Sequence, residues 1–241
     1  RGDLGIEVPY YDVPTIQKML IKKANLKGIP VITATQMLLS MTQNERATRA
    51  EISDVANAVL DGTDVVMLSE ESAVGEDPIN VVDTMHNIIA KTEGIYNYDK
   101  QYEMPYLDEF DVIQATVTKL ADDLKANGIL AITSSGKSAL KMSRYRPKTP
   151  IFTFTHKKKV LNSLTAIWGV ETIGIIKEAQ ASKMFQKMLV ALDERGLLNK
   201  NGLYVATVGY PVGMPGSTNT IKILTPSEIE YYLNFKDKKA K

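Results

Sequence analysis

The feature that most constrains the fold is a repeated order of a short apolar run, a polar tip and an amphipathic segment. Residues 30–32 form one apolar run, which turns polar at Thr33 and Thr35, and residues 64–68 form a second that ends in Ser69. A stretch with helical periodicity separates the two runs, and its connections are short. This alternation predicts an α/β fold, in which crossover helices join parallel strands and polar side chains gather beyond the strands' carboxyl ends.

The segments between the predicted strands carry helix start and stop signals. The apolar spacing predicts a helix over residues 12–27, with Asp12 as its N-cap and Gly28 at its end. Thr48 and Glu51 have the spacing of a capping box, so a second helix is expected to start there.

Composition limits the kind of protein. The 241 residues are 44% hydrophobic, which is enough for a packed core, and the net charge is only +1. No basic stripe indicates a nucleic-acid partner, and no apolar run approaches the ~20 residues that span a membrane. We therefore expect a soluble, cytoplasmic protein. Because Arg1 lies inside a motif, we expect the chain to be the C-terminal piece of something longer.

A tyrosine-rich stretch without periodicity, residues 96–111, predicts a linker and a domain boundary near residue 98. Beyond it, the pattern predicts a helix over residues 112–126, a strand over 129–132 and a later helix over 179–195. The chain therefore contains a second series of α/β units.

A small polar loop follows the predicted strand 129–132 and precedes a helix. Backbone N–H groups at such a helix start, together with hydroxyl groups, suit a phosphate. The glycine-to-lysine spacing is not that of a P-loop, so the residues alone leave phosphate binding and simple helix capping as equal alternatives. The loop consists of Thr133, Ser134, Ser135, Gly136, Lys137 and Ser138.

Two further features of the second half bear on anion binding. Residues 157–159 are three consecutive lysines at a predicted helix start. Positive charges are unfavourable at this end of a helix, so these lysines are either solvated charges that the helix tolerates or groups that attract an anion. Residues 209–220 form a glycine- and proline-rich loop that is too long for a turn, and long loops in compact domains tend to be functional.

Several motifs together closely resemble pyruvate kinase. The resemblance is continuous along the chain, and its first two motifs are the most specific. The motifs are Arg1-Gly2-Asp3-Leu4-Gly5, Ala34-Thr35-Gln36-Met37-Leu38, Thr48-Arg49-Ala50-Glu51, Ser53-Asp54-Val55-Ala56-Asn57-Ala58-Val59 and Val65-Val66-Met67-Leu68-Ser69-Glu70-Glu71-Ser72-Ala73.

The resemblance implies a fold, a reaction and an assembly. Residues 1–98 would be the last strands and helices of a TIM (β/α)8 barrel, and residues 99–241 a smaller α/β regulatory domain with a mostly parallel sheet. The implied reaction transfers the phosphoryl group of phosphoenolpyruvate to ADP, giving pyruvate and ATP, with Mg²⁺ or Mn²⁺ and with K⁺. The implied assembly is a homotetramer, and residues 46–51 resemble a subunit contact surface.

The resemblance also assigns roles to residues. Asp3 would be a metal ligand, and the backbone amides of Gly2 and Asp3 would hold the substrate carboxylate. Thr35 would contact that carboxylate and form part of a proton relay, while Ser69 and Glu71 would organise water. Glu70 departs from the family, which has glycine there more often, and we expect its side chain to point to solvent.

In the second half, the resemblance favours a phosphorylated effector held by the loop at 133–138 and by Gly213, Gly216, Ser217 and Thr218. Which effector binds stays open: a sugar bisphosphate, a sugar monophosphate and AMP are alternatives. Further catalytic lysine, metal-binding and nucleotide-binding residues of the family precede its Arg-Gly-Asp motif, so we expect the chain alone to be inactive. The alternative function is an autonomous module that binds a sugar phosphate or a nucleotide.

Overall fold

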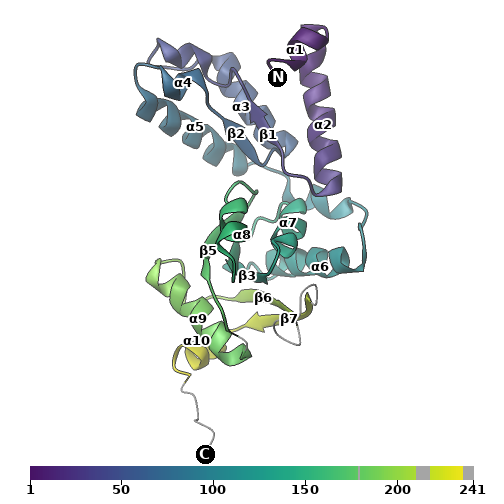
Figure 1. Cartoon of the computed structure of the whole chain (residues 1–241), viewed down its shortest axis with the longest axis vertical. Coiled ribbons are helices and arrows are strands. Elements are labelled where there is room, and N and C mark those ends of the chain that lie inside the picture. Colours follow the sequence, from purple (N-terminus) through teal and green to yellow (C-terminus); the bar gives the residue numbers. More distant parts are fainter. Residues whose placement is uncertain (179, 210–217, 236–241) are drawn as a thin grey trace, which may run out of the picture. The chain divides into compact units, whose positions relative to one another are not determined.

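The computed structural model describes residues 1–178, 180–209 and 218–235. The chain divides into two compact units, residues 1–100 and residues 101–241. Figure 1 shows the helices and strands of both units along the chain.

Unit 1 alternates helices with two short strands. Its two strands, β1 and β2, pair in parallel, with Ile32 opposite Val65. The elements in order are α1 (Leu4–Glu7), a 3-10 turn (Tyr10–Asp12), α2 (Val13–Lys27), β1 (Ile32–Ala34), a second 3-10 turn (Leu39–Thr42), α3 (Arg49–Asp61), β2 (Val65–Met67), α4 (Glu70–Ala73) and α5 (Pro78–Glu93).

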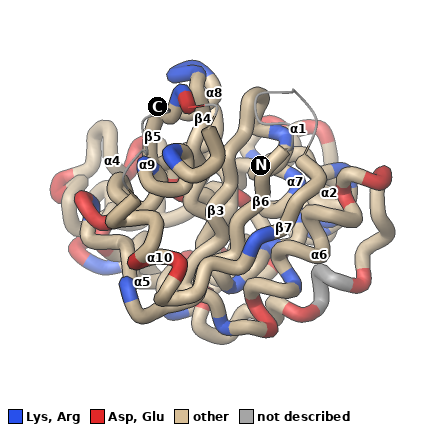
Figure 2. The backbone as a smooth tube through the Cα atoms, turned by 90° about the horizontal axis from the view of Figure 1, so that it is seen from below, with Lys and Arg blue, Asp and Glu red and all other residues tan. Residues whose placement is uncertain are grey.

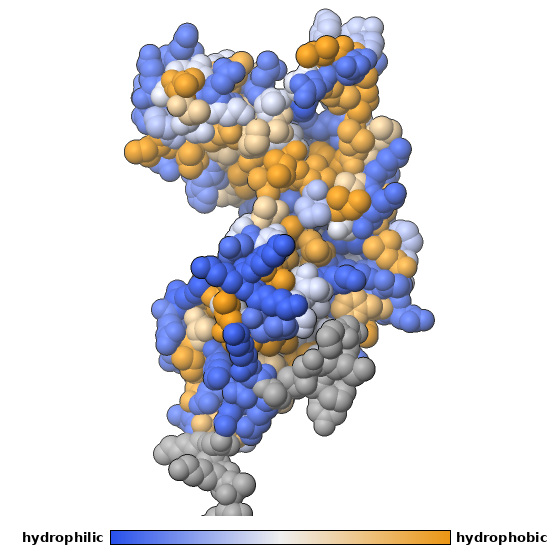
Figure 3. All heavy atoms as spheres, in the orientation of Figure 1, coloured by the Kyte–Doolittle hydropathy of each residue, from blue (hydrophilic) through white to orange (hydrophobic). Residues whose placement is uncertain are grey.

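The core of unit 1 lies where α3 and α5 pack beside the turn that follows β1. Its buried side chains are Met37, Leu38, Met41, Val55, Ala58, Val81 and Met85. Large apolar side chains also lie at the surface of this unit, among them Ile6, Val74 and Ile79; Figure 3 shows apolar side chains on its visible face.

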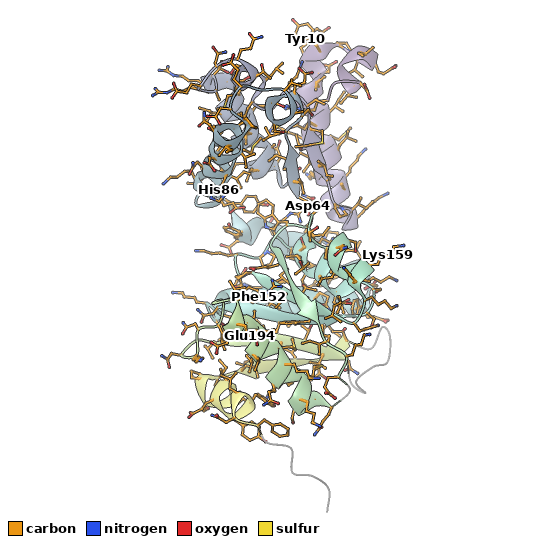
Figure 4. All side chains as sticks on the ribbon, turned by 60° about the vertical axis from the view of Figure 1, so that its left-hand side comes forward. Tyr10, Asp64, His86, Phe152, Lys159 and Glu194 are labelled. Atoms are coloured by element: carbon orange, nitrogen blue, oxygen red, sulfur yellow. The ribbon has the colours of Figure 1, made fainter. Side chains whose placement is uncertain are left out.

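Two local predictions for unit 1 are wrong. The first strand begins at Ile32 instead of ending there, and Ile32 is 56% exposed rather than buried. Residue 30 is a proline, which has no N–H to donate, and the N–H of Val31 binds the side chain of Asp64 (2.9 Å), labelled in Figure 4. Asp12 makes no side-chain cap, because it belongs to the 3-10 turn that runs directly into α2.

The other helix signals of unit 1 are confirmed. The Thr48 side chain accepts a hydrogen bond from the Glu51 N–H, and the Glu51 side chain accepts one from the Thr48 N–H. Gly28 ends α2 in the left-handed conformation that glycine favours.

Unit 2 contains a five-stranded sheet with the order β5-β4-β3-β6-β7, in which only β7 is antiparallel to its neighbour. A 3-10 turn at Tyr98–Glu103 spans the boundary between the units. The elements that follow are α6 (Glu109–Asp123), β3 (Gly128–Thr133), α7 (Lys137–Arg144), β4 (Ile151–Thr155), α8 (Lys158–Ser163), β5 (Val170–Ile175), α9 (Ala181–Glu194), β6 (Tyr204–Gly209), β7 (Thr218–Leu224) and α10 (Pro226–Leu233).

The sheet of unit 2 is covered on both faces. Side chains of α9 and α10 pack on one face with Leu130, and side chains of α6 and α7 pack on the other with Ile129. The buried Phe152, labelled in Figure 4, belongs to the first face. A Cβ at Gly128 would lie only 2.3 Å from Phe152 Cε2, so this strand start requires glycine.

The helix limits of unit 2 differ from the predicted ones. The helix expected over 112–126 begins earlier, at Glu109, because the side chain of Asp108 caps it by accepting a hydrogen bond from the Asp111 N–H (2.8 Å). The helix expected over 179–195 spans Ala181–Glu194, and Ala179 lies outside the described residues.

Candidate active site and anion loop

The chain takes an unusual course where β1 ends. Thr35 and Gln36 both have positive φ angles, 72° and 54°. A β-branched residue rarely adopts this left-handed conformation, and the strain persists only where surrounding contacts hold it. The end of β1 is therefore a constrained turn, and the backbone conformation of this turn fixes the direction in which the Thr35 side chain leaves the chain.

The guanidinium group of Arg1 supplies those contacts. Its Nε donates to the carbonyl of Ala34 (3.1 Å), and its Nη2 donates to the carbonyl of Thr35 (2.5 Å). Its Nη1 lies 2.5 Å from Oδ2 of Asp54, on α3. Neither Arg1 nor Asp54 has a function predicted from the sequence, although both lie within the motifs. A contact between positions 53 residues apart leaves no local signal in the sequence.

The Arg-Gly-Asp segment and the end of β1 meet. The N–H of Gly2 donates to Oγ1 of Thr35 at 3.1 Å, so the structure brings together two residues that the sequence placed in one site. Since the backbone N–H uses the threonine oxygen as acceptor, the hydroxyl hydrogen of Thr35 is available to another acceptor. Asp3 is exposed at the start of α1 and makes no side-chain cap there.

Glu71 links the ends of the two strands. Its side chain is buried, with Oε1 accepting from the N–H of Leu38 (3.1 Å), after β1, and Oε2 from the N–H of Ser69 (2.7 Å), after β2. Burial acts to raise the pKa of Glu71, but the backbone N–H groups of residues that include Ser69 and Leu38 outweigh it and hold the pKa below its usual range. Glu71 is thus a charged brace between the two strand ends, whereas its neighbour Glu70 is exposed.

In the described part of unit 1, Asp3 is the residue that the sequence predicted as a metal ligand, and it would supply only part of a ligand set. Among the residues that the structure describes, no group of three or more His, Cys, Asp or Glu side chains could hold a metal ion. Asp3 offers one exposed carboxylate, and Mg²⁺ prefers near-octahedral oxygen coordination. Asp3 therefore fits a role as one ligand of a metal whose other ligands come from elsewhere.

The candidate anion loop of unit 2 joins β3 to α7. Oγ1 of Thr133 accepts a hydrogen bond from the N–H of Gly136 (3.0 Å), which closes the loop on itself. Gly136 has a φ of 87°, and a Cβ there would lie 3.3 Å from Leu164 Cδ2. The side chains of Ser135 and Lys137 are exposed at its rim, and Ser134 is half-buried.

The second part of the predicted effector site is described only at its end. Oγ of the buried Ser138 lies 3.4 Å from Oγ1 of Thr218, the first residue of β7. This contact brings the two predicted segments together beyond the carboxyl ends of β3 and β6. Gly213, Gly216 and Ser217 lie outside the described residues.

The lysines of α8 and α9 differ in their surroundings. Residues 157–159 are exposed at the start of α8, which is blue in Figure 2, and Figure 4 labels Lys159. On α9, Lys187 forms an ion pair with Glu178 at 3.2 Å.

Two family models match the chain, one in each unit. The model described as the pyruvate kinase barrel domain matches residues 1–82, and the model of the pyruvate kinase alpha/beta domain matches residues 111–224. The barrel match explains why β1 and β2 are parallel and why their polar tips lie at the same end.

Curated relatives carry the same description. The chain is 42% identical over 229 residues to a pyruvate kinase of Lactobacillus delbrueckii subsp. bulgaricus, covering 92% of this chain and 39% of the relative. It is 45% identical over 237 residues to a pyruvate kinase of Geobacillus stearothermophilus, covering 95% of this chain and 40% of the relative. The chain thus spans less than half the length of these relatives.

A solved structure agrees with the sequence relatives. The crystal structure of a pyruvate kinase from Cryptosporidium parvum superposes with a TM-score of 0.86 at 35% identity, covering 93% of this chain and 45% of that one. Within the described part of the chain, no helix combines the length and apolar character needed to cross a membrane. From the two family models, the relatives and the shared fold, we conclude that this chain belongs to the pyruvate kinase family.

Proposed function

We propose that the chain takes part in the glycolytic transfer of the phosphoryl group of phosphoenolpyruvate to ADP, which gives pyruvate and ATP. The observation that carries this proposal is the hydrogen bond from the Gly2 N–H to Thr35 Oγ1, because it joins the two segments on which the family's substrate carboxylate rests. A bound carboxylate would replace Thr35 Oγ1 as the acceptor of the hydrogen bond from the Gly2 N–H, and it would accept a second hydrogen bond from the Thr35 hydroxyl.

The residues of unit 1 would deliver the proton that converts the enolate of pyruvate into pyruvate. Loss of the phosphoryl group leaves the enolate of pyruvate, which takes a proton on carbon. Thr35 is a poor acid on its own, so its hydroxyl would relay the proton through water held by Ser69. Glu71 would position this relay, because its charged carboxylate fixes the N–H groups of Ser69 and Leu38.

A divalent metal fits this proposal through Asp3. Mg²⁺ or Mn²⁺, when bound, supplies charge neutralisation to the transferred phosphoryl group, and the family also uses K⁺. Asp3 would provide one carboxylate ligand, and its exposed position leaves it accessible to such an ion. The remaining ligands would come from residues other than those described here.

For unit 2 we propose an effector site. Its residues would be the loop at 133–138 together with Thr218 and the predicted residues Gly213, Gly216 and Ser217, with a phosphorylated molecule as ligand. The closed loop, the exposed Lys137 and the helix start of α7 support this assignment. We further propose a cytoplasmic homotetramer, in which the surface around residues 46–51 contacts another subunit.

The test is immunodepletion. An antibody raised against the 241-residue chain is used to deplete an extract of the natural source, and pyruvate formation from phosphoenolpyruvate and ADP is followed with Mg²⁺ and K⁺ present. We expect activity to fall in parallel with the chain, while a pre-immune antibody leaves it unchanged. Activity that survives complete removal of the chain would contradict the proposal.

The alternative is an autonomous regulatory module, and the same material separates it from the kinase. The pure 241-residue chain should form no measurable pyruvate, because residues the family needs are not among those it carries. If depletion spares the activity while the pure chain still binds a sugar phosphate or AMP, the regulatory module is the better description.

A further inference from the structure

The contacts of α7 separate into two groups at its two ends. Its first residue, Lys137, belongs to the candidate anion loop. Its last turns, through Lys141 and Arg144, bind residues 105–111, the segment of unit 2 that leads into α6 and includes its first turn. At 1.5 Å per residue, its eight residues extend about 12 Å, so α7 is a short rigid rod between the loop and this stretch.

The deeper group of contacts is a buried triad. The side chains of Asp111 and Arg144 are fully buried, and Arg144 Nη1 lies 2.9 Å from Asp111 Oδ2. The hydroxyl of Tyr145 donates to the same oxygen at 2.8 Å, and the N–H of Leu107 is a third donor to it at 2.8 Å. The other nitrogen of the guanidinium, Nη2, donates to the carbonyl of Pro105 (2.8 Å).

This convergence fixes one arrangement. Three donors share a single oxygen of Asp111, while its Oδ1 is buried without a hydrogen-bond partner in the described structure. A buried ion pair of this kind costs desolvation, and apolar residues of similar volume often stabilise a fold as well. Its best-attested advantage is that it specifies one geometry, here the position of α7 against residues 105–111.

A second, more exposed contact connects the same elements. The ammonium group of Lys141 donates to both carboxylate oxygens of Asp108. Asp108 is also the N-cap of α6, where it accepts from the N–H of Asp111. A shift of α7 would therefore disturb the cap of α6 as well as the buried triad.

We propose that α7 couples the anion loop to the segment of unit 2 where α6 begins: an anion bound at residues 133–138 is felt at residues 105–111 through Arg144, Asp111, Lys141 and Asp108. This rests on the effector site proposed above. By thermodynamic reciprocity, weakening the contacts at the far end of α7 must then change the affinity of the loop for its anion.

The experiment is hydrogen exchange of the full 241-residue chain, with inorganic phosphate as the probe. Phosphate should slow exchange at residues 133–138, which reports binding, and also at residues 105–111, at least threefold at saturation. In the Asp108→Asn variant, asparagine still caps α6 but loses the charge that Lys141 binds. We expect the loop to remain protected, the effect at 105–111 to fall by at least half, and half-saturation to need at least threefold more phosphate.

The control is Asp193→Asn, which removes the charge from another surface ion pair of unit 2, Lys200 with Asp193 at 2.8 Å. It should behave as the parent chain does. Loop protection without any change at 105–111 in the parent would overturn the coupling alone, and so would an Asp108→Asn variant indistinguishable from the control. No loop protection at any phosphate concentration would overturn the effector site, and the coupling with it.

Discussion

Arg1 and Asp54 form an ion pair, with Nη1 2.5 Å from Oδ2, and the same guanidinium binds the carbonyl oxygens of Ala34 and Thr35. One arginine thus connects the start of the chain, the end of β1 and the helix α3. The pair orients the guanidinium, and the guanidinium in turn holds the left-handed turn at Thr35.

We expect Asp54→Asn to destabilise unit 1 by about 0.5–1 kcal/mol, because the pair is partly exposed and solvent screens it. The local effect should be larger than the global one, with faster amide exchange at residues 34–37. Urea-dependent hydrogen exchange, read separately for peptides of unit 1, measures both.

The matched control for Asp54 is Asp61→Asn, which breaks the pair between Lys18 on α2 and Asp61 on α3 (2.6 Å). It should leave exchange at residues 34–37 unchanged. Equal effects of the two variants on that stretch would contradict a specific role for the Arg1–Asp54 pair.

Glu71→Gln should cost about 2 kcal/mol at neutral pH, since hydrogen bonds to a charged group contribute about 1.5–3 kcal/mol and the amide keeps only one acceptor oxygen. The pKa of Glu71 in the folded chain lies below the ordinary 4.5. Its contribution is therefore fully present above pH 4.5 and is lost as the pH falls through the lower, folded-state pKa.

Comparing the parent with Glu71→Gln between pH 3 and pH 7 isolates this residue from other carboxylates with lowered pKa values, such as Glu51. The difference in unfolding free energy should be constant at the upper end and shrink below pH 4.5. Glu70→Gln, at the exposed neighbour, is the control and should be neutral within about 0.5 kcal/mol. A difference that does not depend on pH would contradict the charged state of Glu71.

Local signals predicted much of the fold. The capping box of Thr48 with Glu51 and the glycine stop at Gly28 need only neighbouring residues, and both are confirmed. The alternation of strand and helix likewise predicted parallel pairing, which β1 and β2 show.

What the sequence could not provide depends on distant contacts. The start of β1 is fixed by Asp64 acting on Val31 across 33 positions, and the turn at Thr35 by Arg1. No glycine marks Thr35 as left-handed, and nothing near Arg144 indicates that Asp111 will bury its charge. The roles of Gly2, Asp3, Thr35, Ser69, Glu71 and the anion loop stay predictions from the family resemblance.

Thr35→Ser tests whether the turn at the end of β1 stores strain. Serine keeps the hydroxyl that accepts from the Gly2 N–H but lacks the branched methyl group that makes a positive φ unfavourable. We expect unit 1 to gain about 0.5–1 kcal/mol in unfolding free energy, since the strain of such residues is about 1–3 kcal/mol and only part is relieved. Thr15→Ser, on α2, is the control and should give no gain; a loss with Thr35→Ser would contradict the strain.

Gly136→Ala tests the geometry of the anion loop. The φ of 87° is unfavourable for alanine, and its Cβ would lie 3.3 Å from Leu164 Cδ2, so we expect a loss of about 1–2 kcal/mol in the stability of unit 2. Phosphate affinity, measured by titration calorimetry, should fall at least fivefold, because the N–H of residue 136 can no longer keep its bond to Thr133 without strain.

The matched control for Gly136 is Gly174→Ala in β5. Its added Cβ would meet no atom within 4 Å, and its φ is not positive, so it should leave phosphate affinity unchanged. If Gly136→Ala were destabilised as expected yet bound phosphate as the parent does, the loop would be a helix cap and not an anion site. If both variants bound as the parent does and neither lost stability, the left-handed turn itself would be wrong.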